Sequence, residues 1–163
     1  NSDWVPNSEM FYVGGANSIR AFSVRGIGPG AMKSFGQHAY DYLFRNGTIK
    51  FVCNLEYRTQ LFGNLSGALF LDAGNVWYPS DDHYDDPDLD QVFSPGNFKW
   101  SNFLREQALG TGLGLRYDLS FLIIRLDWGF ALHLPYDTGS SGYFNVNGFK
   151  GNNTLHFAIG YPF

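Results

Sequence analysis

The sequence predicts an all-β fold, namely the C-terminal five antiparallel strands of a transmembrane β-barrel with a loop region before them. Three observations predict it. The last nine residues alternate in polarity with a period of two, four earlier segments do the same, and the connections alternate between short and long. The composition agrees, because 18% aromatic residues, 20 glycines and only 16% charged residues suit strands and tight turns.

The final segment, residues 155–163, puts an entirely apolar or aromatic face on one side of an extended strand. The last strand of an outer-membrane barrel needs such a face toward lipid. Taken alone, the segment also fits the buried last strand of a soluble sandwich. Its face consists of Leu155, Phe157, Ile159, Tyr161 and Phe163.

Four more segments, residues 48–61, 65–76, 109–119 and 122–134, each have one apolar face and one face of charged, glycine or small residues. Each is as long as the ~9–11 residues of a tilted strand that crosses a bilayer, whereas soluble strands have about 5–6. Aromatic residues near the strand ends match the membrane interfaces: Tyr57 and Phe62, Trp77 and Tyr78, Tyr117 and Phe121, Tyr161 and Phe163.

The connections predict which end of each strand faces which side of the membrane. Residues 63–64 and 120–121 form tight turns, whereas residues 79–107 and 135–153 form long polar loops. Bacterial barrels have short periplasmic turns and long exterior loops. Five strands cannot close a barrel, and residues 1–10 do not resemble an export signal. We therefore expect the C-terminal portion of a longer protein, with a loop region at 1–47 and five strands at 48–163.

Several other classes of protein are disfavoured. A net charge of −4 argues against a nucleic-acid partner, and the lone Cys53 allows neither an intrachain disulfide nor a cysteine metal cluster. The acidic run at 80–90 lacks the ligand spacing of an EF-hand, so no metal or cofactor is expected. The common catalytic motifs are missing, so we expect no enzyme, and His133 and His156 are expected to line a polar interior.

Residues 10–30 resemble loop six of the Omp85 superfamily, the outer-membrane assembly and translocation barrels. The matching residues are Gly14, Gly15, Ile19, Arg20, Phe22, Gly28 and Pro29. Phe70, Asp72 and Gly74 resemble the family's Phe-x-Asp-x-Gly strand motif, Gly112 and Gly114 resemble the Gly-x-Gly motif of the next strand, and the last nine residues resemble its terminal assembly signal. Ala21 stands where the family usually has glycine, which points to the TamA-like branch of the BamA/TamA assembly barrels, or bacterial surface antigen family.

The resemblance implies a sixteen-strand barrel preceded by periplasmic POTRA repeats. It also implies that loop six folds into the lumen, where Arg20 would meet Asp72, with Glu56 and Arg116 on the same face of neighbouring strands. A buried arginine needs a carboxylate to offset its lost hydration, and a bidentate pair also orients it. A solvated loop cation is the alternative.

The implied function is assembly and insertion of outer-membrane proteins in the bacterial outer membrane. Leu155, Phe157, Ile159, Gly160, Tyr161 and Phe163 would form the signal and a seam that templates client strands. The expected partners are lipids, unfolded client barrels, periplasmic or lipoprotein subunits, and the rest of the barrel. Two alternatives are a transporter that secretes one passenger and a barrel that anchors a hydrolase domain.

Overall fold

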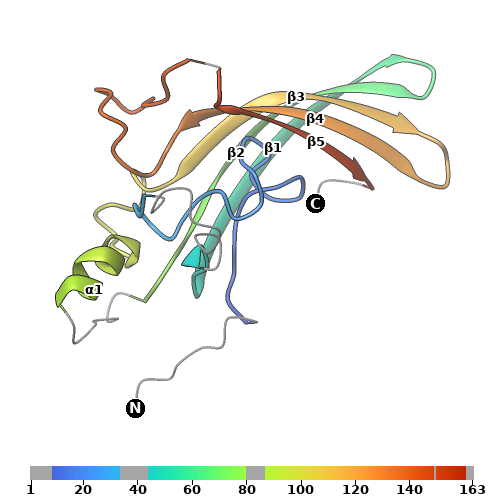
Figure 1. Ribbon diagram of the computed structural model, residues 1–163. Helices are drawn as coiled ribbons and strands as arrows, with labels where there is room; N and C mark the ends of the chain where they lie inside the picture. Colours follow the sequence, from blue (N-terminus) through green and yellow to red (C-terminus); the bar gives the residue numbers. More distant parts are fainter. Residues whose placement is uncertain (1–8, 34–43, 80–86, 149, 161–163) are drawn as a thin grey trace.

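A computed structural model describes residues 9–33, 44–79, 87–148 and 150–160, and its main feature is one antiparallel sheet in the order β1-β2-β3-β4-β5 (Figure 1). Tyr161 and Phe163 lie outside the described residues. The prediction of five antiparallel strands is confirmed. The strands are β1 (Ile49–Phe62), β2 (Leu65–Trp77), β3 (Ala108–Asp118), β4 (Ile123–His133) and β5 (Asn153–Ile159).

The boundaries of β1 to β4 fall within one residue of the predicted ones, because the period of two ends where glycine and polar turns begin. β5 begins two residues before its predicted start and ends at Ile159, and residues 161–163 of the predicted strand lie outside the described residues. The predicted loop between β2 and β3 also contains a short helix, α1 (Pro87–Phe93), and the 3-10 turn η2 (Ser94–Gly96). Asp88 and Asp90 favour the helix because they lie in its first turn, near the positive end of its dipole. No helix in the described ranges has the length and hydrophobicity needed to cross a membrane.

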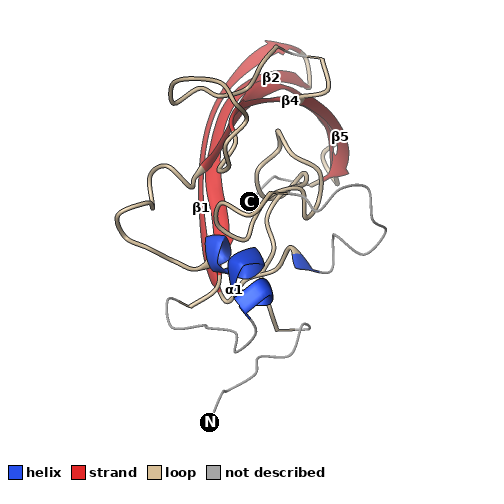
Figure 2. Ribbon diagram, turned by 60° about the vertical axis from the view of Figure 1, so that its left-hand side comes forward, coloured by secondary structure: helices blue, strands red, loops and turns tan. Residues whose placement is uncertain are grey.

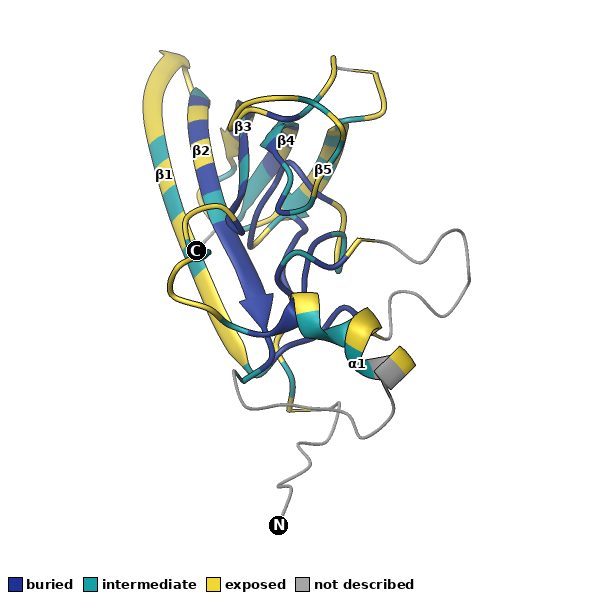
Figure 3. Cartoon of the chain, turned by 90° about the vertical axis from the view of Figure 1, so that its left-hand side faces the viewer, coloured by how far each residue is buried: buried dark blue, intermediate teal, exposed yellow. Residues whose placement is uncertain are grey.

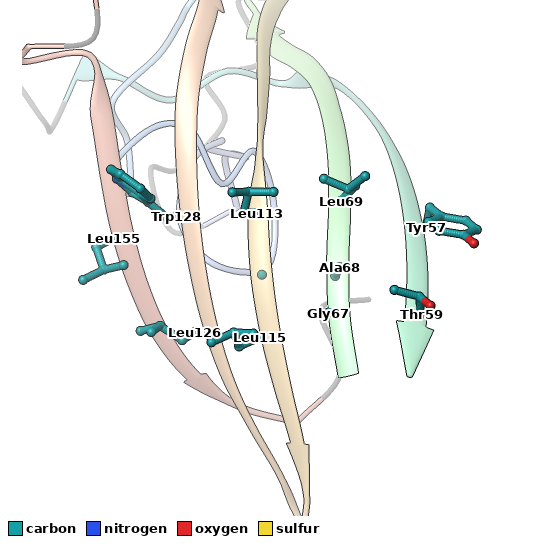
Figure 4. Close-up of a pocket in the computed structure, with 11 residues that line it drawn as sticks. Tyr57, Thr59, Gly67, Ala68, Leu69, Leu113, Leu115, Leu126, Trp128 and Leu155 are labelled. Atoms are coloured by element: carbon teal, nitrogen blue, oxygen red, sulfur yellow. The ribbon is translucent and has the colours of Figure 1, made fainter. Parts of the chain in front are cut away.

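The sheet is strongly curved, and its two faces differ as predicted. Figure 2 shows the strands as an arc around several loops. The outer face exposes apolar side chains from all five strands, and Figure 4 shows Tyr57, Leu69, Leu113, Trp128 and Leu155 lining a shallow apolar pocket there. The outer face therefore resembles a surface that contacts lipid.

Burial is concentrated on the inner, concave face, where a segment that we call the inner loop (residues 10–33) packs against the sheet. The buried cluster joins inner-loop residues to the ends of β2 and β3: Val13, Ile19, Ala21, Phe22, Ile27, Val76 and Ala108. Figure 3 shows that the end of β2 next to this cluster is buried, whereas β1 is exposed or only partly buried. The inner loop thus covers the concave face of the sheet, where a soluble protein would have a second layer of secondary structure.

Both tight turns are present at one end of the sheet. Gly63 has a φ of +52° in the turn between β1 and β2, and the Leu119 amide donates to the Leu122 carbonyl at 2.9 Å in the other turn. At the opposite end, Trp77 and Tyr78 are buried, so they are not the lipid-interface aromatics that the pattern predicted. The loop between β2 and β3 folds over them.

Candidate functional site

The inner loop forms a tight hairpin with Arg20 near its tip. The Gly15 amide donates to the Phe22 carbonyl at 2.8 Å, and the Ser18 amide donates to the Gly15 carbonyl at 3.1 Å. Gly14 has a φ of +96°, and an added Cβ there would lie 2.0 Å from the Ser23 carbonyl oxygen. Only glycine fits this position, which is the physical reason for the first glycine of the pair.

The hairpin brings Arg20 to Asp72 on β2. The Arg20 backbone amide and Nε donate to Asp72 Oδ2 at 2.9 and 2.8 Å, and Nη2 donates to Oδ1 at 2.7 Å. Nη1 donates to Glu56 Oε2 on β1. The side chains of Arg20, Asp72 and Glu56 are 1%, 0% and 3% exposed. This bidentate pair fixes the orientation of the loop tip as well as its position.

Other groups support the same pair. The Arg20 guanidinium lies 3.8 Å from the centre of the Phe70 ring, at cation–π distance. Asn54 Nδ2 donates to Asp72 Oδ1 at 2.8 Å and to the Ser18 carbonyl at 2.7 Å. Burial alone would lower the pKa of Arg20, but the hydrogen bonds and charges of Asp72 and Glu56 outweigh it and raise that pKa. Arg20 is therefore firmly charged.

Arg116 on β3 joins the same centre through Glu56, which it shares with Arg20. Arg116 Nη2 lies 3.1 Å from Glu56 Oε2, and its Nη1 lies 2.6 Å from Asp127 Oδ1 on β4. Arg58 also pairs with Glu56, at 2.5 Å, but is 37% exposed. Alternating charges thus link the inner faces of four strands around the loop tip.

A second contact between the inner loop and the sheet was not predicted. Arg125 Nη2 on β4 donates to Asn17 Oδ1 at 2.5 Å, and Arg125 is fully buried. The Thr154 hydroxyl on β5 donates to the Ala21 carbonyl at 3.1 Å. The inward positions of Arg125 and Thr154 follow from strand periodicity, but no sequence signal identifies their loop partners.

Glycines on the inner face make room for the loop and its charges. An added Cβ would lie 2.4 Å from the Arg20 carbonyl oxygen at Gly129 and 2.2 Å from the Ala21 Cβ at Gly110. At Gly112 it would lie 2.4 Å from Phe70 Cζ, and at Gly114 2.4 Å from Arg116 Nη1. The predicted Gly-x-Gly pair therefore makes space for the Trp128 carbonyl, the Phe70 ring and the Arg116 side chain. The loop contacts Gly110 through the Ala21 Cβ and Gly129 through the Arg20 backbone.

The remaining predicted loop and strand residues lie around this centre. Ile19 and Phe22 are buried in the cluster under the inner loop. Gly28 has a φ of +85° and precedes Pro29 through a cis peptide bond, next to the end of β2. At Gly74, an added Cβ would lie 2.4 Å from the Phe51 carbonyl oxygen, so glycine allows close pairing with β1.

The terminal strand lies at one edge of the sheet. Leu155, Phe157 and Ile159 are exposed on the outer face. Gly160 has a φ of +96°, and its amide donates to the Ile123 carbonyl at 2.8 Å. β5 pairs with β4 from Ile124 to Phe130, and no other described strand pairs with β5.

A curved antiparallel sheet with a lipid-like outer face and a charged inner face that holds a loop has the features of part of the wall of a membrane β-barrel. Within the described ranges, no cluster of three or more His, Cys, Asp or Glu side chains could hold a metal ion. The sequence model of the Omp85 superfamily domain matches residues 1–163. The chain therefore belongs to the Omp85 superfamily, a family of outer-membrane β-barrels that assemble or secrete proteins and are generally not enzymes. No individual curated protein and no solved structure matches the chain.

Proposed function

We propose that this chain is the C-terminal part of a bacterial outer-membrane insertase, with the loop-six region at 1–47 and the last five barrel strands at 48–163. The insertase would fold client barrel proteins into the membrane by templating their strands beside β5. Lipids and unfolded clients are its partners, and periplasmic or lipoprotein subunits would deliver the clients.

The single observation that carries the proposal is the shortness of β5. This strand has seven residues, against eleven in β4 and fourteen in β1, so it offers few amide and carbonyl groups for closing the barrel against another strand. An available strand edge exposes amide and carbonyl groups that can pair with an incoming strand. Gly160 and Pro162 follow the strand in the sequence, and proline lacks the amide that extended pairing would need.

The inner loop is also consistent with this function. The bonds of Arg20 to Asp72 and Glu56 would hold the loop against the sheet while client strands pair beside β5. Because the loop occupies the concave side of the sheet, it would also restrict passage through the lumen. That restriction favours one alternative, a transporter in which the loop is a plug that moves when a dedicated passenger passes.

Site-specific photo-crosslinking tests the proposal in full-length protein reconstituted in lipid vesicles. A photoreactive residue replaces Phe157 on β5 in one variant and Leu115 on β3 in a matched control, since both side chains are exposed on the outer face. We expect several unrelated, partly folded barrel clients to crosslink at position 157 and not at position 115. Equal crosslinking at both positions would contradict the seam, and crosslinks to one passenger from the inner face at His156 would indicate secretion.

A further inference from the structure

Five aromatic rings form a continuous cluster at the long-loop end of the sheet, which we call the rim cluster. Phe103 lies between strand and loop, with ring centres 5.3 Å from Phe51 and 5.7 Å from Trp77. Trp100 extends the cluster outward, 5.8 Å from Phe103 and 5.1 Å from Phe98. The cluster thus joins β1 and β2 to residues 97–107 of the connecting loop.

The register shows that the rim cluster lies outside the sheet. Trp77 pairs with Ile49, and directly paired residues of antiparallel strands share a face. Ile49 and Phe51 belong to the exposed outer row of β1. Trp77 therefore points outward, yet it is 0% exposed because the loop covers it and Glu106 Oε2 accepts its Nε1–H at 2.7 Å.

The loop that covers Trp77 exposes two other large apolar side chains. Trp100 is 81% exposed and Leu104 is 73% exposed. Lys99 and Arg105, both exposed, flank them. Such a pattern suits the boundary between acyl chains and headgroups, where tryptophan is favoured and cationic side chains reach phosphates.

Hydrogen bonds hold the loop in this position. The Tyr143 hydroxyl donates to the Leu104 carbonyl at 3.2 Å, and His133 Nε2 lies 2.7 Å from the Arg105 carbonyl oxygen. His133 ends β4 and Tyr143 lies in the connection that follows it, so both contacts fix the loop backbone at residues 104 and 105.

We propose that residues 97–107 dock on the membrane leaflet that faces the long loops, beside β1 and β2. Trp100 and Leu104 enter the boundary of the acyl chains, and Lys99 and Arg105 contact lipid phosphates. Lipid is the occupant because the patch is continuous, through Phe103 and Phe51, with the outer face of the barrel wall. The docking does not depend on whether the barrel inserts or secretes proteins.

Spin-label accessibility tests this in full-length protein in phospholipid vesicles, with the other cysteines removed by Cys53→Ser and equivalent changes. Labels are attached after Trp100→Cys, after Leu55→Cys on the outer face, and after Ser141→Cys in the other long loop. All three positions are exposed, so the labels should not disturb folding. We expect the ratio of oxygen to nickel-chelate collisions at position 100 to exceed that at 141 severalfold and to approach that at 55.

Two results would overturn the proposal. A ratio at position 100 equal to that at position 141 would mean that the loop stands in water. A ratio that falls to the value at 141 when the protein is diluted with lipid would mean that a second copy, and not lipid, covers the patch. A high ratio that survives dilution, and that drops when Lys99→Glu and Arg105→Glu are introduced, supports docking on lipid phosphates.

Discussion

Removing the Arg20 side chain should release the inner loop from the sheet. Arg20→Ala leaves two carboxylates, Asp72 and Glu56, buried without their main cation. Breaking one partner of a buried pair costs about 3–5 kcal/mol. At about 1.4 kcal/mol per factor of ten, this raises the population with a detached loop roughly 100- to 4000-fold. Amide hydrogen exchange at position 20, whose backbone N–H is donated to Asp72 Oδ2 on β2, measures that population in the full-length protein.

Arg58→Ala is the matched control, because Arg58 pairs with the same Glu56 but is 37% exposed. An exposed pair is worth only about 0–1 kcal/mol, so this variant should exchange within a factor of about five of the wild type. Arg20→Lys keeps the positive charge but loses the bidentate contact with Asp72, so its exchange rate should lie between those of Arg20→Ala and Arg58→Ala. Equal exchange in Arg20→Ala and Arg58→Ala would refute the reasoning that burial makes the Arg20 pair strong.

Three further predictions follow from the same geometry. Gly129→Ala should detach the inner loop, because its Cβ would lie 2.4 Å from the Arg20 carbonyl oxygen. Gly67→Ala is the control and should leave the loop in place, because the nearest atom to its Cβ lies at 3.4 Å. Limited proteolysis of the loop compares the two variants, and equal protease sensitivity would contradict this prediction. Burial raises the pKa of the Glu106 carboxyl above its usual value of 4.5, despite the opposing hydrogen bond from Trp77. The protonated carboxyl therefore stabilises the folded state at pH below 4.5, and this stabilisation is lost as the pH rises through the pKa of the folded state. Glu106→Gln should therefore flatten the fall in Tm as the pH rises above 4.5, and an unchanged slope would count against the buried carboxyl. Cys53, exposed on the outer face, should react in vesicles with a membrane-soluble maleimide and resist a charged one, and equal reaction rates would place it in water.

The strands could be predicted from the sequence because each strand shows its own alternation of apolar and polar or small residues. In β2, for example, outward Leu69 and Leu71 alternate with inward Phe70 and Asp72. The meeting of Arg20 with Asp72 was predicted from a family resemblance and not from periodicity, which says nothing about which loop reaches which strand.

Contacts that depend on the path of a loop could not be predicted. Nothing in the sequence around Trp77 indicates that residues 97–107 fold back over it, because the same alternation fits an exposed tryptophan. The pairing of Asn17 with Arg125 joins residues 108 positions apart, and neither belongs to a recognised motif. The strand patterns likewise do not reveal that Gly110 and Gly129 make room for Ala21 and Arg20 of the loop, since small inward residues are common in any wide barrel.

One hydrogen bond has a mechanical consequence. Thr154 joins β5 to the Ala21 carbonyl, one residue from the arginine that is anchored on β1 and β2. The inner loop is therefore a brace between the terminal strand and the far side of the sheet. Pulling β5 outward must stretch or break this brace, and by thermodynamic reciprocity a loosened loop must make β5 easier to displace by the same free energy.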